Sequence, residues 1–84
     1  MSDEQSEMFD ELADTADAIA GTAEASALVH DELADTLPSA RAHAAREHLL
    51  AEAERAAAVA YREHRVPPPE VRQAIGEAGA PQEP

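Results

Sequence analysis

Four histidines stand among many acidic residues, and a metal site or an acid–base pair is built from these residue types. The chain has 4 His residues and 18 Asp and Glu residues. His43 with Glu47, and His48 with Glu52, have the four-residue spacing that places two side chains on one face of a helix. However, no Glu precedes a His by three residues, as the repeated Glu-x-x-His pattern of di-metal helical bundles requires. We therefore predict no metal site and no cofactor.

Nucleophilic and phosphate-binding chemistry also lack their usual sequence signals. There is no cysteine, no serine accompanied by a base in a strained turn, and no glycine-rich loop among the three separated glycines. The absence of cysteine also excludes disulfides and cysteine-based zinc sites. We therefore predict that the protein is not an enzyme and has no catalytic residue.

The apolar pattern predicts an all-α chain that begins with a long helix over about residues 3–36. Small or apolar residues recur at alternating three- and four-residue steps, as on one face of a helix. These residues are Phe9, Leu12, Ala16, Ile19 and Ala23. Gly21 lies where this register begins to drift, so we consider two alternatives: one continuous helix, or a break at Gly21.

Prolines mark the remaining elements. Pro38 predicts a turn followed by a second helix over residues 39–64, so residues 1–65 should form an antiparallel helical hairpin. Residues 66–69 read as a polyproline spacer, residues 70–79 as a short amphipathic third helix, and residues 80–84 as a disordered tail. Val71 and Ile75 on the third helix form a candidate C-terminal docking segment, or else fold back onto the hairpin.

Large apolar side chains are scarce in this chain, whose 44% hydrophobic content is mostly alanine. Burying one such side chain contributes about 1.5–3 kcal/mol, against an ordering cost of about 1.5 kcal/mol per residue. We therefore expect two hairpins to assemble as a homodimer, giving a four-helix bundle. The predicted oligomer or partner interface consists of Phe9, Leu12, Ile19, Val29, Leu33, Leu37, Leu49, Val59 and Tyr61.

Charge is divided unequally along the chain, whose net charge is −12. Eleven of the 18 acidic residues precede Pro38, whereas all six basic residues are arginines that follow it. Three interpretations remain open: a solvated face, a halophilic surface, or a docking face for a basic partner. The predicted acidic docking face consists of Glu7, Asp10, Glu11, Asp14 and Asp17. Direct binding to nucleic acid is disfavoured because phosphates would be repelled.

These features favour a non-catalytic interaction module, such as an adaptor, regulator or accessory subunit, that acts by protein–protein contact. Its expected partners are a second copy, a protein with a basic or apolar surface, or both. The alternatives are an acidic inhibitor that mimics nucleic acid and occupies a DNA-binding protein, and an oligomeric metal-binding helical-bundle enzyme. The first residues lack the features of a signal peptide and no apolar run is long enough to span a membrane, so we expect a cytoplasmic protein without membrane contact.

In outline, a short acidic hairpin that dimerises resembles the small secreted proteins defined by a Trp-x-Gly turn. Here Leu37-Pro38-Ser39-Ala40 stands at the turn instead of the Trp-x-Gly motif. Arg65, four residues after Tyr61, stands where those proteins carry an acid. The resemblance is therefore one of architecture, and it assigns no family.

Overall fold

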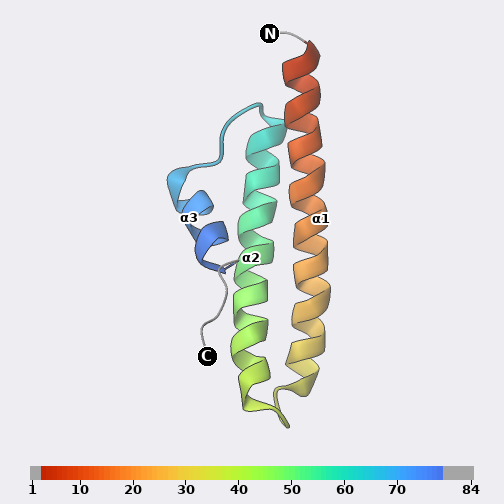
Figure 1. Ribbon diagram of the computed structural model, residues 1–84, viewed down its shortest axis with the longest axis vertical. Coiled ribbons are helices and arrows are strands. Elements are labelled where there is room, and N and C mark those ends of the chain that lie inside the picture. The colour runs from red at the N-terminus through yellow and green to blue at the C-terminus, as the bar shows by residue number, and fades with distance from the viewer. Residues whose placement is uncertain (1–2, 79–84) are drawn as a thin grey trace.

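The computed structural model describes residues 3–78, and within this range the chain forms three α-helices and no strand. These helices are α1 (Asp3–Leu33), α2 (Pro38–Arg62) and α3 (Pro69–Ala78). Figure 1 shows α1 and α2 lying side by side and antiparallel, with α3 beside α2 and the first turns of α1 extending past the end of α2. The predicted all-α helical hairpin is confirmed. None of the helices in this range combines the length and apolar character that a membrane span requires.

The first helix runs unbroken through Gly21. Gly21 is exposed, and a Cβ added there would meet nothing within 4 Å, so packing within the chain does not require this glycine. The helix ends at Leu33, earlier than the predicted residue 36. Its last carbonyl accepts hydrogen bonds from the backbone N–H groups of Thr36 (3.1 Å) and Leu37 (2.8 Å), which closes the turn.

Proline fixes the start of α2. Leu37 has an extended backbone (φ −128°, ψ 98°), as the residue before a proline prefers, and Pro38 is the first residue of the helix. A proline in this position sacrifices no hydrogen bond, because the first N–H groups of a helix have no intrahelical partner. The direction change predicted at Leu37-Pro38 is therefore produced by local backbone preference.

The end of α2 adopts a left-handed cap that usually employs glycine. His64 has φ 55°, its N–H donates to the carbonyl of Tyr61 (2.9 Å), and the N–H of Arg65 donates to the carbonyl of Ala60 (2.9 Å). This pair of bonds is the Schellman motif. The ring of His64 stacks on that of Phe9 in α1, with centroids 5.3 Å apart and planes 12° apart. This contact compensates part of the conformational cost of a non-glycine residue.

The contact between α1 and α2 is made almost entirely of alanine. We call the buried alanines of α1 the inner stripe: Ala13, Ala16, Ala20, Ala23 and Ala27. The buried alanines of α2 are Ala40, Ala44, Ala51, Ala53, Ala57, Ala58 and Ala60. None of the described large side chains is fully buried. Leu12 and Ile19, two of the larger residues in the sequence-derived pattern, lie outside this contact and are each 39% exposed. The smaller Ala13 and Ala20 occupy the contact, since methyl groups let two helix backbones approach closely.

The third helix folds back along α2. Its Val71 and Ile75 are half-buried and pack against the cluster formed by Ala57 and Ala58 of α2 with Ala16 of α1. Pro67, within the predicted spacer, is buried, and α3 starts at the last proline of that spacer. Of the two alternatives for the C-terminal segment, the structure describes the folded-back one. The predicted tail, 80–84, lies outside the described residues.

Candidate binding groove

A second regular stripe runs along α1, one residue out of phase with the inner stripe. We call it the outer stripe, and its members are Met8, Leu12, Thr15, Ile19, Thr22, Ser26, Val29 and Leu33. The steps of four and three residues repeat without interruption, which is the heptad pattern of a helix with a helical neighbour. Ser26 is half-buried and the other seven side chains are exposed. Five of the ten exposed large apolar side chains in the described chain belong to this stripe.

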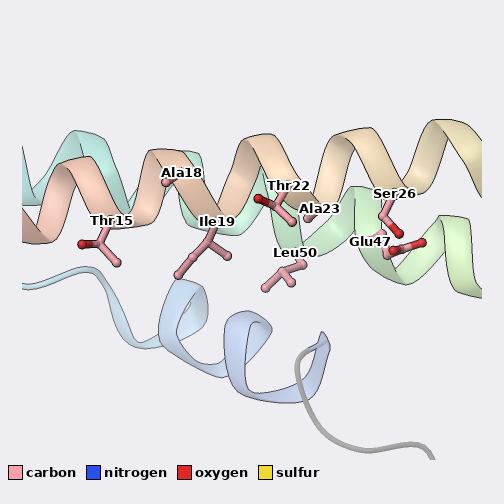
Figure 2. Close-up of a pocket in the computed structure, with 8 residues that line it drawn as sticks. All are labelled: Thr15, Ala18, Ile19, Thr22, Ala23, Ser26, Glu47 and Leu50. Atoms are coloured by element: carbon pink, nitrogen blue, oxygen red, sulfur yellow. The ribbon is translucent and has the colours of Figure 1, made fainter.

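The middle of the outer stripe forms one wall of an open groove of about 540 Å³. The groove is lined by Thr15, Ala18, Ile19, Thr22, Ala23, Ser26, Glu47 and Leu50. Figure 2 shows Thr15, Ile19 and Thr22 leaving α1 on the same side, with Leu50 of α2 beside them. The lining residues of α1 extend from 15 to 26, about 16 Å along a helix axis. The groove thus offers an elongated, mainly apolar surface with interspersed hydroxyl groups.

Polar side chains from both long helices close one end of the groove. His30 Nδ1–H donates a hydrogen bond to Glu47 Oε1, and the rings of His30 and His43 lie with centroids 5.4 Å apart. Burial alone would raise the pKa of Glu47, but hydrogen bonds from Ser26 and His30 and the charges of the two histidines outweigh it, so its pKa is lowered. No group of three His, Asp or Glu side chains within residues 3–78 is placed to hold a metal ion. The arrangement therefore orients Glu47 as a fixed hydrogen-bond acceptor beside the groove.

The predicted acidic docking face is divided by an arginine. Asp17 accepts a hydrogen bond from Arg62 of α2, and Asp14 lies 3.5 Å from the same guanidinium. The hydrogen bond to Asp17 is the main reason that the pKa of Arg62 is raised. Glu7 and Glu11 are exposed and form no ion pair within the described chain. Exposed pairs such as Arg62 with Asp17 contribute little to stability and weaken further in salt.

The flank of the hairpin that carries the Arg62–Asp17 pair also carries two more ion pairs between α1 and α2. Arg55 of α2 binds Glu24 of α1, and His48 Nε2 lies 2.9 Å from the Asp31 carboxylate. Asp17, Glu24 and Asp31 follow one another at seven-residue steps, so they share one flank of α1. None of them lines the groove, whose α1 residues lie on the other flank of the inner stripe. Sequence reasoning did not identify these partners.

The predicted interface residues fall into three groups. Phe9 and Tyr61 pack on each other within the chain, with ring centroids 6.5 Å apart. Four others belong to the outer stripe: Leu12, Ile19, Val29 and Leu33. The remaining three are exposed at separate places on the turn and on α2: Leu37, Leu49 and Val59. The outer stripe is therefore where the predicted residues are brought together.

Glu54 is a buried acid that sequence reasoning missed. It occupies the face of α2 that contacts α1 and is only 7% exposed. Burial raises the pKa of its carboxyl group. In sequence, Ala51 and Ala58 lie three residues before it and four after it, and this spacing was the available signal that Glu54 belongs to the buried face.

Replacing Glu54 by Gln should stabilise the hairpin at neutral pH. A raised pKa means that the folded state holds the proton more tightly than the unfolded state, so the ionised form opposes folding. This penalty is present above the folded-state pKa and disappears as pH falls below the ordinary value of 4.5. Thermal unfolding at pH 7 and pH 4 should show a higher Tm for Glu54→Gln at pH 7 and a smaller difference at pH 4. Glu52→Gln, an exposed position on the same helix, is the control. An equal effect of both substitutions at pH 7 would contradict the assignment.

No protein-family model, no curated protein and no solved structure matches this chain.

Proposed function

We propose that this protein is a non-catalytic interaction module whose working surface is the outer stripe of α1, and that two copies assemble through it as a four-helix homodimer. One observation carries the proposal. The buried side chains of residues 3–78 are alanines, Pro67 and Glu54, whereas ten large apolar side chains are exposed. The chain thus exposes Leu, Ile, Val and Met side chains, which most proteins bury in their core.

Energetics support assembly through this surface. An alanine contributes one methyl group to a core, whereas full burial of a Leu, Ile, Val or Met side chain contributes about 1.5–3 kcal/mol. A single chain of 8.9 kDa with no cysteine has few other sources of stability. Pairing of two outer stripes removes five large apolar side chains of each copy from water without altering the hairpin.

A second candidate function is an acidic inhibitor that occupies the site of a DNA-binding protein. One observation favours it: the first turns of α1 extend past the end of α2 (Figure 1). Glu4 and Glu7, which precede the contact of Phe9 with Tyr61 of α2, and also Glu11, are exposed without an ion pair in the described chain. Such a protein would bind through charge, and its complex would weaken steeply with salt. A dimer of chains with a net charge of −12 should instead be strengthened by salt, because screening reduces repulsion between the copies.

The test is the mass in solution, measured by light scattering together with helicity by circular dichroism over a range of concentrations and at low and high salt. We expect twice the chain mass of 8.9 kDa, with a dissociation constant that falls as salt rises. A monomer that remains fully helical and stable at every concentration and salt would refute the homodimer. In that case, the acidic-inhibitor candidate should be tested with a basic DNA-binding protein.

A further inference from the structure

We infer that the two copies pair antiparallel through their outer stripes, about a two-fold axis between residues 20 and 21 of each α1. This inference rests on the proposed homodimer and specifies its contact. Thr15 of one subunit would then face Ser26 of the partner subunit, so the centre of the contact coincides with the groove.

The outer stripe is a near-palindrome in residue type. Reversing its direction about the point between residues 20 and 21 gives four pairs: Met8 with Leu33, Leu12 with Val29, Thr15 with Ser26, and Ile19 with Thr22. The first two pairs match large apolar side chains, and the third pair matches two hydroxyl groups. A two-fold interface requires a surface that complements its own reversed copy, and three of the four pairs meet this requirement, whereas Ile19 faces Thr22 across the axis.

Hydroxyl groups in the middle of the stripe support the same register. Burying a hydroxyl without a partner is costly, so polar residues inside a helix–helix contact should face each other. In the antiparallel register, Thr15 lies opposite Ser26 of the partner subunit at two symmetric positions, where the Ser26 oxygen can accept a hydrogen bond from Thr15 while its O–H donates to Glu47 of its own subunit. A shift by one heptad would place Ile19 or Leu33 of the partner subunit, and not Ser26, opposite Thr15, and would leave Leu33 or Met8 beyond the end of the partner's stripe.

Charge also favours the antiparallel direction. Residues 3–17 of α1 contain seven acids, whereas residues 18–33 contain three. A parallel pair would align the two acid-rich halves, but the antiparallel pair places each of them beside the acid-poor half of its neighbour. It also brings the start of the partner's α2 to the level of the acid-rich half, because α1 and α2 are antiparallel within each hairpin. That segment, residues 38–46, contains no acid, so it adds no further repulsion there.

Cysteine cross-linking tests the inference cleanly, because the natural chain contains no cysteine. Thr15→Cys and Ser26→Cys are prepared as separate full-length proteins, mixed as dimers, allowed to exchange and oxidised mildly. We expect a disulfide joining one Thr15→Cys chain to one Ser26→Cys chain, formed at least about tenfold faster than in either protein alone, since the contact raises the effective concentration of the two thiols. Leu28→Cys, on the opposite flank of α1, is the matched control and should cross-link slowly with either protein.

Each other outcome overturns the inference in a distinct way. Rapid disulfide formation within each single-cysteine protein would indicate a parallel contact, which contradicts the antiparallel register but leaves the homodimer standing. A dimeric mass without rapid cross-linking in any mixture would place the contact on another face. A monomeric mass for the natural protein would refute both the inference and the homodimer on which it rests.

Discussion

Replacing Ala20 by Leu is expected to lower the free energy of unfolding by about 1–3 kcal/mol, which corresponds to a fall in Tm of roughly 5–20 °C for a chain of this size. Ala20 is 0% exposed at the centre of the inner stripe. It belongs to the same buried cluster as Ala23 and Ala51, so the contact with α2 is alanine against alanine. Leucine adds three carbons where two helices meet closely, and they can be accommodated only if the helices separate. Thermal and chemical unfolding followed by circular dichroism would measure the loss.

Ala25→Leu is the matched control for this prediction. Ala25 lies on the same helix but is exposed, so the larger side chain extends into solvent. Its effect should stay within about 0.5 kcal/mol, as is usual for surface substitutions. If Ala20→Leu were as stable as Ala25→Leu, the contact between α1 and α2 would not be the close alanine packing described above.

The helices could be predicted from sequence because their signals are local. Pro38 and the prolines at 67–69 interrupt the apolar pattern at the two places where the chain changes direction. Their restricted backbone acts within one or two residues, so no knowledge of the tertiary structure was needed. The cap at His64 was missed because glycine is the usual signal for a left-handed cap, and here a ring stacked on Phe9 from another helix stabilises a histidine.

The packing face could not be predicted in the same way. The sequence-derived pattern contains Ala16 and Ala23 together with Leu12 and Ile19, and the hairpin buries the two alanines and leaves the two larger residues 39% exposed. In α1 two adjacent faces both repeat with heptad spacing, one of small residues and one of larger ones. Periodicity identifies both faces but does not say which one meets α2. Close approach of the backbones decides this, and it is a property of the two helices together.

The groove and its polar end illustrate the same limit. Glu47 was recognised from sequence only as a neighbour of His43 on one helix. Its contacts with Ser26 and His30 join residues 17 to 21 positions apart and exist only once α1 and α2 have paired. A single sequence does not specify how far one helix is shifted along its neighbour. The side-chain contacts between α1 and α2 therefore could not be derived from it. The exposed outer stripe, by contrast, contains four residues that sequence reasoning had already assigned to an interface.

Replacing Ile19 by Asp is expected to weaken the proposed dimer by about two to four orders of magnitude in dissociation constant. The substitution removes the burial of one isoleucine per subunit, about 1.5–3 kcal/mol each, and the two-fold axis doubles the effect. It also introduces a carboxylate into an apolar contact, where desolvation adds to the loss. The hairpin itself should persist, since Ile19 is 39% exposed and lies outside the inner stripe. Light scattering across a dilution series, with circular dichroism as a check on folding, would measure both effects.

Leu28→Asp separates the effect of the stripe from the effect of added charge. Leu28 is on the same helix, is 57% exposed and faces the flank that carries Glu24 and Asp31. The substitution has the same change in charge as Ile19→Asp, so it reproduces any general repulsion between two more acidic chains. If both variants dissociated equally, repulsion and not the outer stripe would control assembly. If Ile19→Asp became monomeric and helical while Leu28→Asp stayed dimeric, the large apolar residues of the outer stripe would belong to the contact between subunits, as proposed.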